Sequence, residues 1–386
     1  MKIVTPSFHH SDCLWSSALY SRRMFRVLVL SLLIGCASAA QTEYVFLVTA
    51  DGIRHQEVFT GVDVELVKDS SKTNSGIERA AELREKYWAE SAKERREKLM
   101  PFLWKDLIKE GVLYGNRELG SEVVVRNPHW FSYPGYAEIL NGGPVAAIKS
   151  NDSTFSPRET VLEFIRRKFN LKPTEVAAFG SWEVFNWITM QKEGSIYCNA
   201  GYEAISAASG VKVNDRMKQW SDLQFEMMTG WDSVRHDAVT LNLALEHLAA
   251  YQPKVMYLAL GETDDWAHDR RYDRTVHYVG YFDEALRRLW TTIQSSPKYR
   301  GKSALIVTVD HGRGRTGRDW TSHGKDTAGS NETWLGVFGP TVKKVGEMKG
   351  GPQYSASNVA GTILALLGID AKEYEGSVAP PVAEVK

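Results

Sequence analysis

Short apolar runs alternate with amphipathic stretches along most of this chain. Four runs are rich in apolar, often β-branched residues and end at polar or Gly positions, which is typical of buried strands: residues 44–50, 175–180, 254–260 and 305–309. Between them, apolar residues recur at helical spacing in three stretches: residues 160–169, 237–249 and 277–290. This alternation predicts an α/β fold with a mostly parallel central sheet and helices on both of its faces.

Acidic and imidazole side chains come directly after three of the predicted strands. Asp51 follows the first strand, and Asp264 lies four residues beyond the strand at 254–260. Asp310 and His311 end the last strand. One such strand end is equally well explained by an ordinary capped turn. Since ligands bind at the carboxyl ends of parallel strands, the recurrence favours one shared site at that edge of the sheet.

The types of these side chains indicate a metal site. Carboxylate oxygens and imidazole nitrogens are both good ligands for a divalent transition metal such as zinc. Asp264 and His268 are four residues apart, so one helical turn places them on the same side. Asp265 is the alternative ligand, and the spacing favours Asp264. His323 completes a set large enough for two metal ions.

Ser132 is a candidate nucleophile. It precedes Pro134 and Gly135 and an apolar stretch that suits a helix, so it lies at or just before a helix N-terminus. The free backbone N–H groups and partial positive charge there favour an anion and an ionised hydroxyl. The open alternative is a serine that only caps the helix.

Composition excludes some classes of function. The 386 residues carry 47 basic and 47 acidic side chains, so no net charge draws the protein to nucleic acid, and no basic surface with interleaved aromatic residues is evident. Cys13 and Cys36 lie in the N-terminal segment, which leaves Cys198 as the one cysteine of the remaining chain. We therefore expect no disulfide framework and no cysteine-based zinc site.

Residues 1–40 have the features of a secretory signal. Arginines precede an apolar run at 27–34, which is followed by an Ala-Ser-Ala cleavage pattern at 37–39. Residues 33–36 also resemble a bacterial lipobox, in which case Cys36 carries a lipid, and an uncleaved anchor is the third alternative. The chain is thus expected to be exported, to the periplasm or the outside, as a soluble or a lipid-anchored protein.

The remaining residues, 41–386, are expected to form a single catalytic domain. Within it, residues 55–98 are polar and strongly charged, and we interpret them as a helical insertion on the surface.

Four motifs in this order resemble the alkaline phosphatase superfamily, and most of all its type I phosphodiesterase/nucleotide pyrophosphatase branch. They are Val-Thr-Ala-Asp-Gly at 48–52, Ser-Tyr-Pro-Gly-Tyr at 132–136, Asp-Asp-Trp-Ala-His at 264–268, and Val-Asp-His-Gly at 309–312 with His323 downstream. The second motif departs from that branch, which usually has Thr followed by Phe-Pro-Asn-His.

The resemblance implies a ligand set and a cofactor, two divalent ions that family members often hold as zinc. One ion is expected at Asp264, His268 and His323. The other is expected at a second group of ligands, namely Asp51, Asp310, His311 and the Ser132 oxygen. Asn151 resembles an asparagine that holds a phosphoryl oxygen of the substrate, although an ordinary loop asparagine explains it equally well.

The implied function is a metal-dependent hydrolase of phosphoric esters, either a phosphodiesterase or a phosphomonoesterase, that acts on a small phosphorylated substrate. A metal-activated Ser132 takes the phosphoryl group as a phosphoserine intermediate, which water then releases. The alternatives are a sulfatase-like enzyme, a phosphomutase-like enzyme and a non-catalytic binding protein with the same fold. Tyr136 weighs against the first of these, because it stands where sulfatases need Arg.

Two further groups of residues have open roles. Arg313, Arg315 and Arg318 follow the last strand, where they either bind a second anionic group of the substrate or form a basic surface loop. Three tryptophans, Trp182, Trp187 and Trp266, either line a cleft for an aromatic leaving group or belong to the core.

Overall fold

The computed structural model describes residues 41–68, 80–206, 210–374 and 378–385. The predicted signal segment, residues 1–40, lies outside the described residues. The described residues form one compact unit. Among the described residues, no helix combines the length and the hydropathy that crossing a membrane requires.

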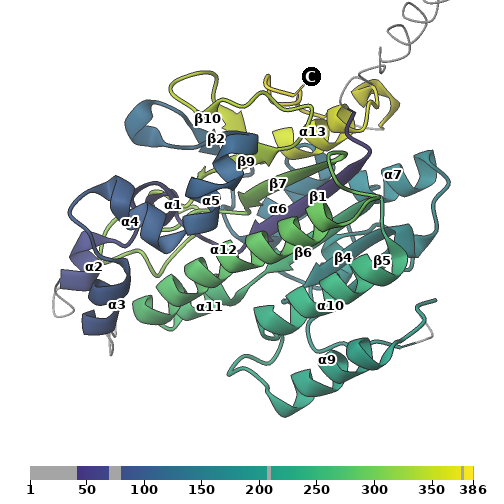
Figure 1. The fold of residues 1–386 in the computed structure, drawn as a ribbon, viewed down its shortest axis with the longest axis horizontal. Coiled ribbons are helices and arrows are strands. Elements are labelled where there is room, and N and C mark those ends of the chain that lie inside the picture. Colours follow the sequence, from purple (N-terminus) through teal and green to yellow (C-terminus); the bar gives the residue numbers. More distant parts are fainter. Residues whose placement is uncertain (1–40, 69–79, 207–209, 375–377, 386) are drawn as a thin grey trace, which may run out of the picture. The chain divides into compact units, whose positions relative to one another are not determined.

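A large central sheet has the strand order β10-β2-β9-β7-β1-β6-β4-β5 (Figure 1). Its strands are β1 (Tyr44–Ala50), β2 (Gly111–Tyr114), β4 (Val176–Gly180), β5 (Tyr197–Ala200), β6 (Val255–Leu260), β7 (Ser303–Val309), β9 (Leu335–Phe338) and β10 (Gly346–Glu347). The run from β7 to β5 is parallel, and β9 pairs antiparallel with both β7 and β2. A second, small sheet contains β3 (Val123–Val124), β8 (Glu332–Thr333) and β11 (Tyr354–Ser355).

The helices cover both faces of the central sheet, as the alternating pattern predicts. They are α1 (His55–Thr60), α2 (Val64–Lys68), α3 (Ala80–Tyr87), α4 (Ala92–Leu99), α5 (Pro101–Lys105), α6 (Ser132–Asn141), α7 (Val161–Lys168), α8 (Phe185–Ile188), α9 (Asp215–Glu226), α10 (Asp237–Tyr251), α11 (Glu262–His268), α12 (Tyr272–Ser295) and α13 (Asn358–Leu366).

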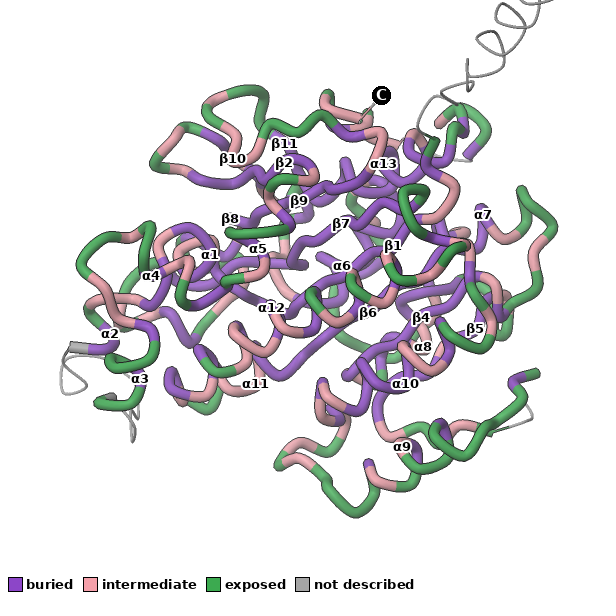
Figure 2. Tube along the Cα trace, in the orientation of Figure 1, coloured by how far each residue is buried: buried purple, intermediate pink, exposed green. Residues whose placement is uncertain are grey.

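Two apolar cores follow from the alternation of side chains along β1. Phe46 and Val48 point to one face and pack with residues of α10 and α12. Val45 and Leu47 point to the other face and pack with α6, α7 and α13 (Figure 1). Because both faces are covered, the strands at the centre of the sheet are buried, apart from Tyr44 at the start of β1 (Figure 2).

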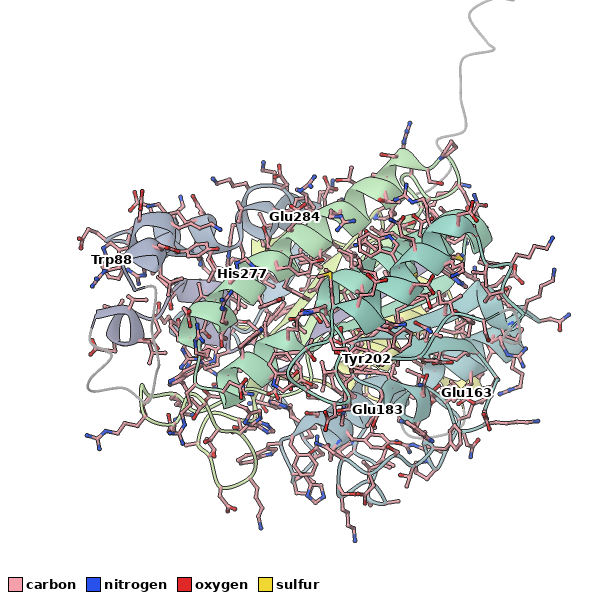
Figure 3. The ribbon with its side chains drawn as sticks, turned by 90° about the horizontal axis from the view of Figure 1, so that it is seen from below. Trp88, Glu163, Glu183, Tyr202, His277 and Glu284 are labelled. Carbon is pink, nitrogen blue, oxygen red and sulfur yellow. The ribbon has the colours of Figure 1, made fainter. Side chains whose placement is uncertain are left out.

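The long helix α12 has one buried and one more exposed face, as its amphipathic sequence pattern predicts. Val276 and Val279 are buried against the sheet, whereas His277 is exposed and Glu284 lies two turns further along the same side of the helix (Figure 3). In the predicted insertion, four short helices, α1 to α4, occupy the described part of residues 55–99. Val58 and Phe59 of α1 are buried in the core, so this region is not purely a solvated surface.

The register of the sheet aligns the three strand ends that carry the candidate ligands. Ala50, the last residue of β1, pairs with Leu260 of β6 on one side and with Val309 of β7 on the other. The next residues of the three strands, Asp51, Gly261 and Asp310, therefore emerge side by side at the same edge.

Candidate active site

Asp51, Asp310 and His311 form a buried cluster at the carboxyl ends of β1 and β7. His311 Nε2 lies 3.2 Å from Asp51 Oδ1 and 3.3 Å from Asp310 Oδ2. Asp310 and His311 are fully buried, and Asp51 is nearly so. One oxygen of each acid, Asp51 Oδ1 and Asp310 Oδ2, is buried with no hydrogen-bond partner among the described residues. Unpaired buried oxygens of this kind require a cation or a proton.

The protonation of His311 makes this cluster suitable for a metal. Its Nδ1 donates to the Gly312 carbonyl at 2.9 Å, which leaves the lone pair on Nε2 facing the two carboxylates. Burial lowers the pKa of His311 to about 4, so the ring is neutral near pH 7. Burial, and then the neighbouring acids Asp264 and Asp51, raises the pKa values of Asp51 and Asp310 well above their ordinary range. A divalent ion would supply the positive charge that these converging atoms lack.

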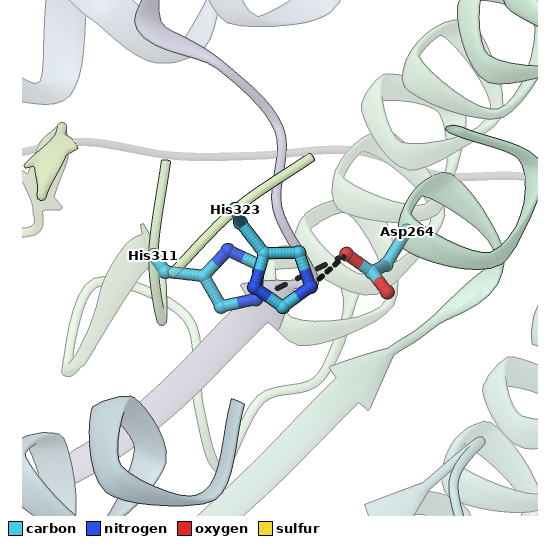
Figure 4. Close-up of side chains that lie close together, drawn as sticks. All are labelled: Asp264, His311 and His323. Carbon is cyan, nitrogen blue, oxygen red and sulfur yellow. Dashed lines mark ion pairs between the residues drawn. The ribbon is translucent and has the colours of Figure 1, made fainter. Parts of the chain in front are cut away.

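Asp264, His268 and His323 form a second group beside the first. His268 Nε2 lies 3.1 Å from Asp264 Oδ2 and 2.9 Å from His323 Nε2, so both rings point their Nε2 atoms at one place. His323 Nε2 is 3.8 Å from Asp264 Oδ1, and its ring stacks on that of His311 at 4.0 Å between centroids (Figure 4). His311 thus lies between the two groups. About half of the His268 side chain is exposed, so this group faces solvent.

Opposing effects act on the acid of the second group. Burial would raise the pKa of Asp264, but the guanidinium of Arg313, together with His268 and His323, holds that pKa well below its ordinary range. For His323, burial and then the proximity of His311 lower the pKa to about 2. An ionised carboxylate and a neutral imidazole are the forms in which Asp264 and His323 would bind metal.

Ser132 is the first residue of α6, and its hydroxyl faces the buried cluster. The helix cap is Phe131, and Ser132 Oγ lies 3.4 Å from His311 Nε2. The alternative of a serine that only caps its helix therefore does not hold. Gly135 allows this approach, because a Cβ at that position would lie 2.3 Å from the backbone oxygen of Asp310.

Asn151 lies next to the nucleophile, although it is distant from the metal ligands in sequence. Its Oδ1 accepts a hydrogen bond of 2.9 Å from the backbone N–H of Tyr133. Asn151 and Ser132 line the same small cavity. All eight predicted site residues thus lie around one end of the sheet.

Three residues shape this site through contacts that the sequence pattern did not predict. Tyr136 donates a 3.0 Å hydrogen bond to Asp51 Oδ2. Arg313 donates to the carboxylate of Asp264 and, at 3.1 Å, to its backbone carbonyl. Gly52 has a positive φ, and a Cβ there would meet Arg313 Nε at 2.9 Å and Asp264 Oδ1 at 3.0 Å. A glycine directly after the acid of Asp51 was the one available signal.

The structure resolves most of the open roles. Arg313 is paired with Asp264 and Arg315 with Glu332, so neither of the two is available to bind a second anionic group of the substrate. Of the three tryptophans, Trp182 lines the cavity beside Ser132. Trp187 lines a different cavity, and Trp266 packs on Trp231.

Part of the chain is similar in sequence to a known protein family. Residues 204–371 match the model of the Metalloenzyme superfamily, a range that includes five of the predicted ligands but not Asp51 or Ser132. No curated protein sequence gives a significant match.

Several solved structures share the fold. The alkaline phosphatase PafA has a TM-score of 0.55 at 10% identity, with 89% of this chain and 99% of PafA covered. A 2-O GAG sulfatase has a TM-score of 0.53 at 12% identity, with coverage of 88% and 73%. The lipoteichoic acid synthase LtaP from Listeria monocytogenes has a TM-score of 0.51 at 12% identity, with coverage of 86% and 74%. At these identities the likeness concerns the fold.

The comparisons do not single out the phosphodiesterase branch from its sister branches, since phosphatase and sulfatase structures match about equally well. The match over residues 204–371 concerns a part of the chain that carries five of the candidate ligands, and the solved structures share the fold of nearly the whole chain. Residues 204–371 are thus similar to the Metalloenzyme superfamily, and the chain has the alkaline-phosphatase-like α/β fold that its sequence predicts.

Proposed function

We propose that this protein is an exported, metal-dependent hydrolase of phosphoric esters, with Ser132 as its nucleophile. One observation carries the proposal. The Ser132 hydroxyl stands at the N-terminus of α6, 3.4 Å from His311 Nε2, and faces buried carboxylate oxygens that have no other partner among the described residues. A hydroxyl in that place combines a helix N-terminus with a cluster suited to cations.

The residues present fit two divalent ions, for which zinc is the expected identity. Asp51, Asp310 and His311, together with the Ser132 oxygen, would hold one ion. Asp264, His268 and His323 would hold the other. When bound, such ions stabilise negative charge on the attacking and the leaving oxygens of an in-line displacement.

The side chains of the protein then account for the reaction as follows. Ser132 gives its proton to solvent water, and its Oγ forms a bond to phosphorus while the ester P–O bond breaks. The leaving oxygen takes up a proton as it departs as an alcohol. Water next attacks the phosphoserine, so that the Oγ–P bond breaks and a proton of that water restores the serine hydroxyl. The product is phosphate from a monoester and a phosphate monoester from a diester. The Nδ2 group of Asn151 would hold a non-bridging phosphoryl oxygen during both steps.

A sulfatase is the second candidate, because a sulfatase is among the structures with this fold. The environment of Tyr136 weighs against it. This residue occupies the position where sulfatases need Arg, and its hydroxyl is buried and bonded to Asp51. We therefore favour phosphoric esters over sulfate esters.

The proposed location is the periplasm or the exterior, and it rests on the sequence of residues 1–40. A lipid on Cys36 would add contact with a membrane. The proposed partner is a small phosphorylated substrate, without nucleic-acid binding.

The experiment compares the purified wild-type protein with Ser132→Ala and with a control, Ser295→Ala, at the distant end of α12. Metal content is measured by mass spectrometry, and hydrolysis is measured on p-nitrophenyl phosphate, bis-p-nitrophenyl phosphate and p-nitrophenyl sulfate. We expect bound zinc, activity on at least one phosphate ester, and a loss of about a thousandfold or more in Ser132→Ala only. A preparation that binds no metal, or unchanged activity in Ser132→Ala, would refute the mechanism, and faster cleavage of the sulfate would favour the second candidate.

A further inference from the structure

The cavity beside Ser132 has a wall that the proposed reaction does not use. Its volume is about 190 Å³, and its lining includes Ser132 and Asn151 on one side and Trp182, Trp231 and Asp265 on the other. A cavity of this size admits a small substituent of the substrate and is too small for a nucleoside.

One acid of this cavity is left over by the proposed metal ligands. The lining contains Asp51, Asp264 and Asp265 and no Lys, Arg or His, and bound metal ions would offset the charge of Asp51 and Asp264. The first two belong to the candidate metal ligands, whereas Asp265 does not. Within the part of the chain that the structure describes, the Asp265 carboxylate makes no hydrogen bond or ion pair with another side chain. Arg313, which follows the ligand His311, is already bound to Asp264.

Two indole rings complete the wall. Trp182 and Trp231 are both half-buried and line the cavity. Trp231 is held in place by Trp266, with 4.9 Å between ring centroids and an interplanar angle of 78°. An isolated β-bridge between Trp182 and Val234 joins the two segments that carry these rings. A carboxylate beside preformed indole rings is the combination that binds alkylated ammonium groups.

We infer that this cavity binds a small alkylated ammonium group, so that the substrate is a phosphoric ester of an amino alcohol. The inference rests on the proposed function, since it names the substrate class of the same site. Asp265 supplies the countercharge, the two indoles supply the apolar and π surface, and Ser132 lies within reach of the phosphorus atom.

The first test uses two isosteric substrates, phosphocholine and 3,3-dimethylbutyl phosphate, which differ by a positive nitrogen in place of a carbon. For the wild-type enzyme we expect kcat/KM to be about tenfold or more higher for phosphocholine. In Asp265→Asn this ratio should fall about tenfold. The control Asp232→Asn, an exposed acid next to Trp231, should keep the wild-type ratio. Glycerophosphocholine, run in parallel, distinguishes a diester from a monoester source of the same group.

The second test does not require turnover. Binding of choline to the zinc-loaded protein is measured by calorimetry for the wild type, Asp265→Asn and Trp231→Leu. We expect saturable binding to the wild type that is weakened about tenfold or more in both variants. Equal kcat/KM for the two isosteric substrates, or choline binding that Asp265→Asn leaves unchanged, would overturn the inference. If no ester is hydrolysed but choline still binds in this manner, the proposed function fails and the cation site stands.

Discussion

Arg313 holds Asp264 by two atoms at once, its carboxylate and its backbone carbonyl. A third hydrogen bond, of 2.7 Å, runs from the same guanidinium to the Thr321 carbonyl. The loop between His311 and His323 is therefore fastened to the helix that carries Asp264 and His268. One side chain links the ligands that follow β6 to those that follow β7.

The first prediction concerns this guanidinium. Arg313→Met leaves the Asp264 carboxylate close to other acids without its cation. The metal-free protein should lose about 3 to 5 kcal/mol in its free energy of unfolding. Zinc should restore most of this loss, because the ion replaces the missing positive charge. Urea unfolding with a chelator and with zinc measures both effects.

Arg315→Met is the matched control, since more than half of that side chain is exposed. Arg315→Met should lower the free energy of unfolding by about 1 kcal/mol or less. Equal losses for Arg313→Met with and without zinc would show that its role is unrelated to the metal ligands.

The second prediction concerns Gly52. Gly52→Ala places a Cβ against Arg313 and Asp264 at a residue with φ +61, so it should impair zinc binding as well as stability. Gly301→Ala has a similar backbone cost, with φ +69, but no atom within 4 Å of the new Cβ. In both variants the strained φ should lower the free energy of unfolding by about 1 kcal/mol. Gly52→Ala should in addition bind much less zinc than the wild type. Thermal unfolding and metal analysis separate the two effects. Full zinc occupancy in Gly52→Ala would contradict the close packing described for it.

The third prediction concerns Tyr136. Tyr136→Phe removes the hydroxyl that orients Asp51, and residues that support a ligand in this way commonly change metal affinity by about 10- to 100-fold. Zinc affinity should fall within this range while the fold is retained. Tyr257→Phe removes a buried hydroxyl that bonds to Thr49 at 3.0 Å, and it should leave zinc affinity near the wild-type value. A competition titration against a chromogenic chelator gives both affinities, and identical results for the two variants would count against an orienting role.

The fourth prediction concerns acid stability away from the site. His247 is buried and stacked against Tyr197 and Tyr251, and burial lowers its pKa to about 4. Above pH 6.5 the imidazole is neutral in both the folded and the unfolded protein. Between pH 6.5 and 4 only the unfolded chain takes up the proton, so the free energy of unfolding falls as the pH falls. The loss contributed by His247 should reach roughly 2 to 3 kcal/mol at pH 4.5.

His247→Gln should show a correspondingly smaller loss of stability between pH 7.5 and 4.5, measured by urea unfolding at each pH. His55, with a pKa also lowered to about 4 by burial, should contribute a similar acid effect of its own. An unchanged pH dependence in His247→Gln would show that this ring is accessible to protons in the folded state.

Local pattern was enough to predict the α/β class and the three strand ends that carry Asp51, Asp264 and Asp310. Alternation of apolar residues is a property of a few neighbouring positions, and the rules of parallel sheets then bring the carboxyl ends of strands to one edge. The register that pairs Ala50 with Leu260 and Val309 made this edge a common site.

Other features depended on contacts between distant segments. Ser132 meets His311 across 179 residues, and Arg313 meets Asp264 across 49. The arginine loop was interpreted as an anion site or a surface loop, and neither interpretation included its pairing with Asp264. The wall formed by Trp231 and Asp265 likewise has no signature in spacing. Hydrophobic periodicity specifies which face of an element is buried, but the packing of loops against one another decides which polar side chains meet, and that packing exists only in the folded chain.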